Sequence, residues 1–304
     1  MVSAFVVKMA LCLKPLRIVN PHYKANGRNH REYTSQPDYY LEVPCGLCIN
    51  CLKAYKSQWR VRLLQEWNYS PFDIKESTYF LTFTIAPEWL DFVSKYPQKA
   101  IKHFRDEYRR IFKCSCRYWS VTEYGDEKGR LHLHAILFGC KASTAQLATI
   151  WKYGFIKKKK CTIRRISYIT KYITKQVDDI FIDKAKKQKV FCSPGIGKKY
   201  CDDSLNVQYA HPQSGRFNLT VSNLGMSYSL PRYYQFKIFT ERERQLIKFD
   251  RLIYMSMPKP PYLVGKMKFG SVESFSNFLL EKHNVLHPLL QKEYEYKKQV
   301  DGLS

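Results

Sequence analysis

The chain has 304 residues and is 45% hydrophobic, enough to bury the core of one large domain or of one domain with accessory elements. Lys and Arg total 51 against 26 Asp and Glu, and the formal charge of +25 favours a polyanionic partner such as a phosphate backbone. No run approaches the ~20 apolar residues of a membrane span, and residues 1–13 lack the features of a signal peptide, so we expect a cytoplasmic protein without membrane contact.

Aromatic residues make up 15% of the chain, with 23 Tyr and 18 Phe. Rings interleaved with cations suit stacking on unpaired bases better than the reading of a closed duplex. We therefore expect single-stranded nucleic acid as the partner. A ribosome-associated or merely basic protein is the alternative.

A cysteine cluster, PCGLCINC at 44–51, is the first distinctive segment after the polar residues 14–44. Its C-x2-C-x2-C spacing is too tight for ordinary disulfides and suits a metal. A structural zinc site needs a fourth ligand, for which Cys12 is the first candidate and His22 or His30 are substitutes. Free thiols or an iron–sulfur site are the alternatives. The predicted zinc ligands are Cys12, Cys45, Cys48 and Cys51.

Hydrophobic periodicity gives the expected elements. Residues 118–124 and 131–138 are strand-like runs joined by the turn-rich GDEKGR, so they should pair antiparallel. Ser143 and Gln146 form a capping-box pattern. The other expected elements are a helix over 52–67, a strand at 79–85, a helix over 101–112, a strand near 154–158, a helix from Tyr168 to about 176 capped by Ser167, a glycine-rich loop at 193–199 and a helix over 275–296.

Two histidines in LHLHA carry the first chemical signal. His132 and His134 project from the same face of their strand, because side chains alternate along it. Glu123 lies on the partner strand just before the turn and supplies a third ligand. Two imidazoles and one carboxylate leave positions for water and a phosphate oxygen, which suits Mg²⁺ or Mn²⁺ in phosphoryl transfer.

Two tyrosines in YITKYITK, at 168–175, carry the second signal. Tyr168 and Tyr172 are four residues apart and share one helical face. Each is followed three residues later by a lysine, Lys171 or Lys175, that can stabilise the phenolate during attack on phosphorus. A tyrosine stripe that packs the helix onto the sheet is the alternative.

Cations flank the tyrosine segment and are candidates for contacts with the DNA phosphates. A solvated charge run is the alternative. GIGKK at 195–199 lacks the spacing of a nucleotide-binding loop, so we expect no nucleotide cofactor. The candidate DNA-binding residues are Lys157, Lys158, Lys159, Lys160, Arg164 and Arg165.

The combined motifs resemble those of the HUH endonucleases, and within them the replication initiator proteins of microviruses of the gokushovirus type. FLTFT at 80–84, LHLHA at 131–135 and YITKYITK are similar to the three family motifs, and the likeness extends over roughly 12–240. It includes the cysteine cluster and the segments EYGDEKGRLHLH, SPGIGKKY and LPRYYQFKIF. Leu133 stands where an aromatic residue is common in the family.

The resemblance implies an α+β fold, in which a central antiparallel sheet is flanked by helices, with the cysteine element before it and a helical extension after it. We expect a cysteine-cluster segment at 1–70, a nickase core at 71–180 and an accessory region at 181–304. The implied enzyme nicks single-stranded viral DNA at the origin through a 5′-phosphotyrosine link and rejoins it, with both tyrosines serving, in rolling-circle replication. Its implied partners are single-stranded and replicative-form viral DNA and a helicase and replication proteins of the host, in the cytoplasm of a bacterial cell.

Two other functions remain open. A plasmid or mobile-element HUH relaxase or transposase would share the chemistry and differ in its DNA. A non-catalytic, zinc-stabilised nucleic-acid-binding protein would use the same histidines and tyrosines structurally. The sequence does not indicate which tyrosine cleaves first.

Overall fold

The computed structural model describes residues 12–20, 39–125, 130–175, 187–211, 217–223 and 225–247. The chain divides into two compact units, one of 1–202 with 220–231 and one of 203–219 with 232–304. The boundaries expected after residues 70 and 180 stay predictions. The helix expected over 275–296, as well as His22 and His30, lies outside the described residues.

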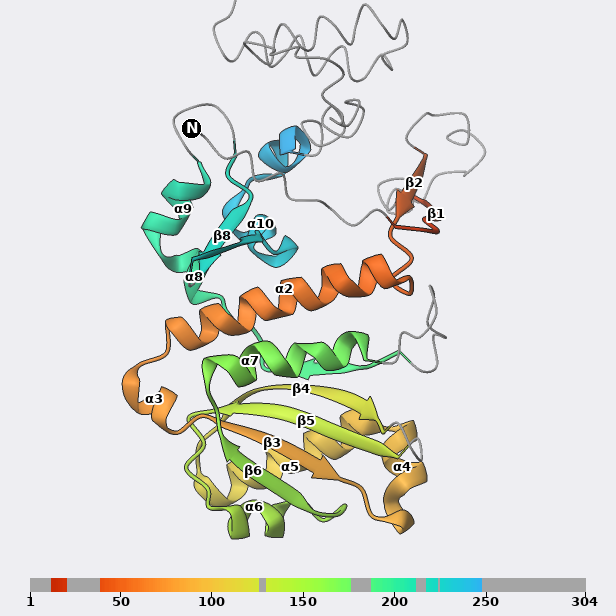
Figure 1. Ribbon diagram of the computed structural model, residues 1–304, viewed down its shortest axis with the longest axis vertical. Coiled ribbons are helices and arrows are strands. Elements are labelled where there is room, and N and C mark those ends of the chain that lie inside the picture. Colours follow the sequence, from red (N-terminus) through yellow and green to blue (C-terminus); the bar gives the residue numbers. More distant parts are fainter. Residues whose placement is uncertain are drawn as a thin grey trace, which may run out of the picture. The chain divides into compact units, whose positions relative to one another are not determined.

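The first unit is built on a five-stranded sheet with the order β6-β3-β5-β4-β7, in which every neighbouring pair is antiparallel. The predicted hairpin of β4 and β5 is confirmed, and so is the mixed α+β class with helices flanking an antiparallel sheet (Figure 1). The strands are β3 (Tyr79–Thr84), β4 (Arg117–Tyr124), β5 (Leu131–Phe138), β6 (Ile156–Lys160) and β7 (Val190–Cys192).

The central strand β5 separates two hydrophobic cores because its side chains alternate between the faces of the sheet. Leu133 and Leu137 belong to one core, whereas Ile136 and Phe138 belong to the other. The run LHLHAILF is therefore a strand that is covered on both sides. His132 and His134 share the second face with Ile136 and Phe138.

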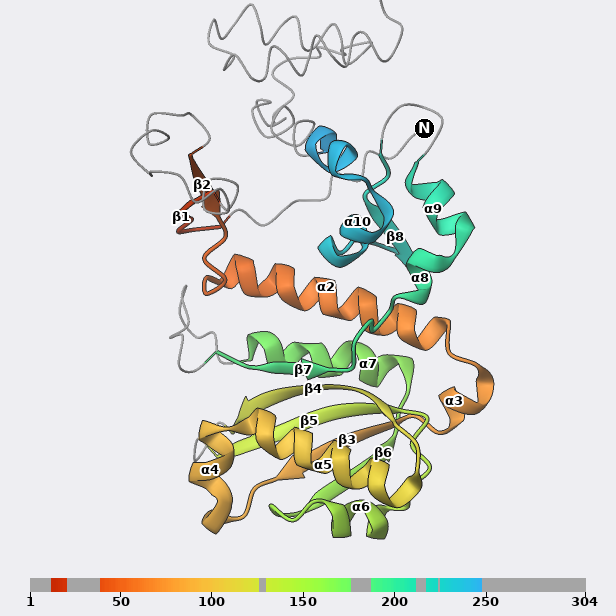
Figure 2. The same cartoon turned by 180° about the vertical axis from the view of Figure 1, so that it is seen from behind.

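Helices α4 and α5 cover the first face, and α6 joins the same core (Figure 2). The predicted apolar face of α5 is confirmed by the burial of Ile101, Phe104 and Tyr108. The predicted capping box of Ser143 and Gln146 is confirmed at the start of α6. These helices are α4 (Leu90–Lys95), α5 (Pro97–Phe112) and α6 (Thr144–Ile150), and a 3-10 turn, η2 (Pro87–Trp89), precedes α4.

The second face is covered by α2 (Ile49–Asn68) and α7 (Ile163–Ile169), which run side by side in Figures 1 and 2. Trp59 and Leu63 of α2 share a core with Ile166 of α7 and with Ile136 of the sheet. The helix predicted to follow the cysteine cluster is confirmed. A short helix, α3 (Phe72–Glu76), leads from α2 into β3.

The helix predicted from Tyr168 with a Ser167 cap is wrong in its start. Helix α7 begins at Ile163, because Thr162 is extended and its hydroxyl accepts a hydrogen bond from the Arg165 amide at 3.3 Å. Ser167 therefore lies inside the helix. After Ile169 the chain tightens into a 3-10 turn, η3 (Thr170–Thr174), where the Thr170 hydroxyl donates to the Ser167 carbonyl at 2.9 Å.

The loop predicted at 193–199 follows β7 and is held against α2. Arg62 donates to the Ile196 carbonyl at 3.1 Å, and the Gly197 amide donates to Glu66 at 2.6 Å. Gly195 and Gly197 both have positive φ, which explains the glycines of this turn. The other elements of the first unit are β1 (Leu16–Val19), β2 (Tyr40–Val43), α8 (Lys199–Asp202), β8 (Thr220–Asn223) and β9 (Met226–Ser229).

The second unit contains α9 (Ser204–Ala210) and α10 (Arg232–Ile238). The rings of His211, Phe217 and Phe239 pack together, with centroids 4.9 to 6.1 Å apart. Across the described part of the chain, none of the helices combines the length and the apolar character needed to cross a bilayer.

Candidate active site

The predicted metal ligands meet across β4 and β5. Glu123 lies directly opposite His132 in the strand register, and its carboxylate accepts a hydrogen bond from Nε2 of His134. Glu123 and His134 are both buried, whereas His132 is half-buried. The three side chains therefore gather on the sheet face that α2 and α7 cover.

Thr82 of β3 fixes the orientation of His134. The two residues are register partners, and the Thr82 hydroxyl lies 3.1 Å from Nδ1 of the imidazole. With Nδ1 engaged by Thr82, Nε2 faces Glu123. An imidazole held through one nitrogen presents the other in a fixed direction, as in protein metal sites.

The two predicted nucleophiles lie over this group. The Tyr172 ring stacks on the His134 ring, with centroids 4.0 Å apart and an interplanar angle of 4°. The Tyr172 hydroxyl donates to the Tyr168 hydroxyl at 3.3 Å. Tyr172 is only 6% exposed, whereas Tyr168 is 47% exposed. The phenols thus form a hydrogen-bonded pair with one buried and one accessible member.

The environments of the phenols shift their pKa values in opposite directions. The Lys171 ammonium, 3.8 Å from the ring centroid of Tyr168, lowers the pKa of Tyr168, with a further contribution from the Tyr172 hydroxyl. Burial raises the pKa of Tyr172, and its hydrogen bond to Tyr168 raises it further. Tyr168 is therefore the phenol that ionises more readily.

The second predicted lysine is bonded to the carboxylate. Lys175 donates a hydrogen bond to Glu123, on the oxygen that His134 does not use. Burial alone would raise the pKa of Glu123, but hydrogen bonds from His134 and Lys175 together lower it. Burial lowers the pKa of His132, which favours the neutral imidazole that binds metals.

A hollow of about 450 Å³ opens beside the tyrosines. Of the six candidate DNA-binding residues, the structure brings four to this hollow. A second hollow, of about 270 Å³, lies on the other face of the sheet and contains neither the histidines nor the paired tyrosines. The first hollow is lined by Phe80, Thr82, Lys157, Lys159, Arg164, Arg165, Tyr168 and Tyr172.

The other two lysines of the KKKK run point away from the hollow, because side chains of β6 alternate between its faces. Lys158 donates to the Ala142 carbonyl at 2.6 Å and lies over the Tyr79 ring. Lys160 forms an ion pair with Glu76 at 2.8 Å. The run is thus an edge strand with two cations on each side.

The donor set at the histidines fits a divalent cation in its chemistry. His132, His134 and Glu123 supply two imidazoles and one carboxylate on one sheet face, and Thr82 supplies the orienting contact. In the structure, Glu123 is bonded to His134 and Lys175. Among the described residues, the metal-binding atoms that converge most closely are those of the cysteines.

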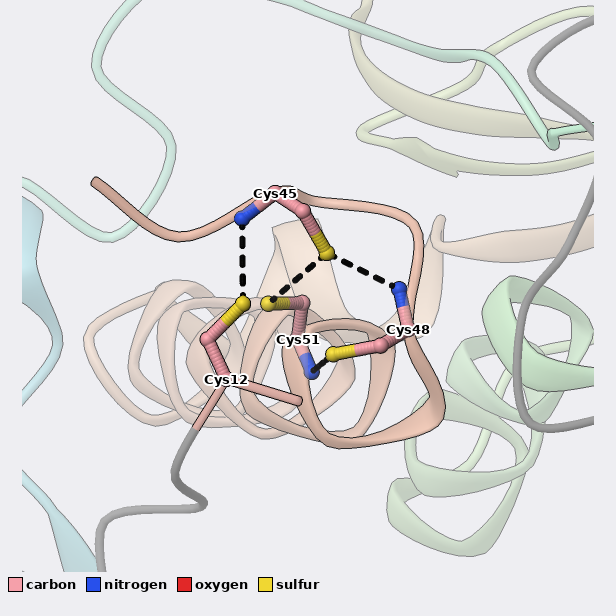
Figure 3. A group of neighbouring side chains, drawn as sticks. All are labelled: Cys12, Cys45, Cys48 and Cys51. Carbon is pink, nitrogen blue, oxygen red and sulfur yellow. Dashed lines mark hydrogen bonds between the residues drawn. The ribbon is translucent and has the colours of Figure 1, made fainter. Parts of the chain in front are cut away.

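The cysteine cluster assembles as a group at the start of α2 (Figure 3). The four predicted ligands have sulfur atoms within 4.8 Å of one another. They are Cys12, Cys45, Cys48 and Cys51.

Sequence reasoning missed the contact of Thr82 with His134, because Thr82 was expected to fill the strand. The signal was the register: an antiparallel pairing of β3 with β5 sets Thr82 opposite His134. It also missed the contact of Lys56 on α2 with Thr174 on η3, at 3.5 Å. No local pattern indicates that contact, since 118 residues separate the partners.

Residues 78–177 match the family model of the Replication-associated protein ORF2 type. This range contains both histidines, Glu123 and both tyrosines. The chain is 24% identical to Replication-associated protein ORF4 of Chlamydia phage 1, over 88% of this chain and 71% of that protein. It is 21% identical to Replication-associated protein VP4 of Bdellovibrio phage phiMH2K, over 81% of this chain and 82% of that protein. No solved structure matches.

Proposed function

We propose that the protein is a replication initiator that nicks single-stranded viral DNA at the origin by tyrosine transesterification and later rejoins the strand to release circular genomes. One observation carries the proposal: two hydrogen-bonded tyrosine hydroxyls lie over a histidine that is itself bonded to a buried carboxylate. The similarity to phage replication-associated proteins supports a microvirus-type initiator among the HUH endonucleases.

The reaction exchanges one phosphodiester bond for another. The Tyr168 or Tyr172 oxygen attacks phosphorus, the bond to the 3′ oxygen breaks, and that oxygen takes up a proton to leave a free 3′-hydroxyl. The 5′ phosphate stays on the tyrosine. Because the bond energy is retained, a 3′-hydroxyl can reverse the exchange and join the strand without a nucleotide cofactor.

His132, His134 and Glu123 would hold the Mg²⁺ or Mn²⁺ ion. A divalent cation bound there supplies Lewis-acid polarisation of a phosphoryl oxygen. Thr82 keeps the imidazole of His134 oriented, and Lys171 favours the phenolate of Tyr168. Each of these contributions comes from a side chain on the same sheet face or on the segment that covers it.

The hollow beside Tyr168 would receive the single strand. Its four cations match a phosphate backbone, and Phe80 offers a ring in its lining. The protein would act on single-stranded and replicative-form DNA in the cytoplasm of a bacterial host. A host helicase and host replication proteins would complete the replication cycle.

The decisive test incubates the full-length protein with Mn²⁺ and labelled single-stranded DNA that spans a candidate origin. A covalent adduct that survives denaturation is expected. Combined Tyr168→Phe and Tyr172→Phe should abolish it, each single change should leave some cleavage, and Tyr79→Phe on the opposite sheet face should retain it. An adduct in the double variant would refute the nucleophiles.

Replacement of both His132 and His134 by Ala should remove the activity together with its metal dependence. If the wild type forms no adduct on any origin sequence, the enzymatic proposal fails. Binding without cleavage would then favour the non-catalytic, zinc-stabilised nucleic-acid-binding protein.

A further inference from the structure

The four cysteines at the start of α2 have the spacing of ligands around one metal ion. Their sulfur atoms all lie within 4.8 Å of one another, and those of Cys45 and Cys51 are 3.9 Å apart (Figure 3). With Zn–S bonds of about 2.3 Å, tetrahedral geometry separates the sulfurs by about 3.8 Å. A disulfide would need about 2.05 Å. The observed separations fit a single tetrahedral ion.

Backbone amides point at the sulfurs. The amides of Leu47 and Cys48 donate to Cys45 Sγ at 3.4 and 3.3 Å, and the Cys45 amide donates to Cys12 Sγ at 3.2 Å. Such donors favour the thiolate, which is the form of cysteine that binds metals. Gly46, with φ of +71°, makes the turn that directs these amides.

The cluster also lies where negative charge is stabilised. Cys48 is the N-cap of the 20-residue helix α2, and its sulfur accepts from the Cys51 amide at 3.5 Å. The positive end of the helix dipole favours a thiolate there. The Lys187 ammonium approaches Gly46, 3.4 Å from where a Cβ would lie, so a cation accompanies the thiolates.

We propose that Cys12, Cys45, Cys48 and Cys51 bind one structural Zn²⁺ ion. A polynuclear iron–sulfur cluster fits less well, because metal and sulfide ions between the thiolates would hold the sulfurs farther apart than 4.8 Å. Four protein ligands leave no open position for a substrate. The site is therefore structural and independent of the proposed nicking activity.

The ion would fasten the N-terminal segment to the helix that supports the tyrosines. Cys12 and Cys45 are 33 residues apart in the sequence, so one ion closes a long loop. Further along α2, Lys56 contacts Thr174, and Trp59 shares a core with Tyr172. The metal thus braces the covering layer of the candidate active site from its outer end.

The first test measures zinc by mass spectrometry in the full-length protein purified without chelators. One equivalent per chain is expected in the wild type and in Cys114→Ser, whose sulfur lies outside the cluster. Cys51→Ser should lose most of the metal. Full zinc occupancy in Cys51→Ser would overturn the proposal.

A second measurement uses the wild type alone, so that it does not depend on the folding of a variant. Replacement of the bound ion by Co²⁺ should produce the thiolate-to-cobalt charge-transfer and visible bands of a tetrahedral thiolate site. Absence of zinc from the wild type together with absence of these bands would refute the site. Iron with acid-labile sulfide would refute zinc and identify an iron–sulfur cluster.

Discussion

The edge strand β6 offers a matched test of how DNA is bound, because its four lysines divide between two faces. Lys157 and Lys159 line the hollow beside Tyr168, whereas Lys158 and Lys160 point to the opposite face. The perturbation is Lys157→Gln with Lys159→Gln, compared with Lys158→Gln with Lys160→Gln. Both double variants remove the same charge from the same strand.

The expected magnitude follows from counterion release. Each phosphate contact with single-stranded DNA contributes about 0.7 to the slope of log K against log salt, so loss of Lys157 and Lys159 should reduce the slope by about 1.4. At about 0.1 M salt this corresponds to about 25-fold weaker binding, or about 1.9 kcal/mol. The control pair should change the slope by less than about 0.3, since its charges face away from the strand.

The assay is a fluorescence anisotropy titration of labelled single-stranded DNA at several salt concentrations, with Mn²⁺ omitted so that no cleavage occurs. Thermal melting of each variant checks the fold, because Lys158 bonds the Ala142 carbonyl. Equal losses in both double variants would mean that only net charge matters. An unchanged slope for Lys157→Gln with Lys159→Gln would exclude the hollow as the binding path.

Three further results are expected at the site. Thr82→Val should weaken Mn²⁺ activation about 10- to 100-fold, because His134 loses its orienting partner; Thr84→Val, whose hydroxyl bonds Phe155, should not. A Mn²⁺ titration of cleavage distinguishes them. Tyr168→Phe should slow the first cut of an intact strand at least about tenfold more than Tyr172→Phe, measured in single turnover; equal effects would contradict this order. In the Tyr172→Phe background, cleavage should rise with pH as Tyr168 ionises, and Lys171→Met should move that rise to higher pH, because the ammonium lowers the pKa of Tyr168; an unmoved pH–rate profile would exclude this role.

The parts of the fold that local pattern determines could be predicted from the sequence. The hairpin of β4 and β5 follows from two alternating runs around a turn, and it brings Glu123 opposite His132. The helix after the cysteines and the capping box of α6 also follow from periodicity and cap chemistry. These features depend on residues close together in the chain.

The remaining features depend on pairings between distant segments. The division of the KKKK run into two faces follows from its pairing with β3, which the sequence does not reveal. Lys175 follows Tyr172 by three residues, yet its ammonium reaches Glu123 because the 3-10 turn η3 rotates the end of the segment. Local spacing therefore identified the right side chains without their partners.

The unequal tyrosines explain how two nucleophiles can act in order without a separate switch. Burial and the hydrogen bond to Tyr168 both raise the pKa of Tyr172, so Tyr172 stays protonated while Tyr168 is the available phenolate. Under the proposed function, attack by Tyr168 converts its oxygen into a bridging ester oxygen, which is a weaker hydrogen-bond acceptor than a phenolate. The first cut thus weakens the interaction that keeps Tyr172 protonated. Alternation then follows from the chemistry of the pair itself, since each covalent step changes which phenol is the easier one to ionise.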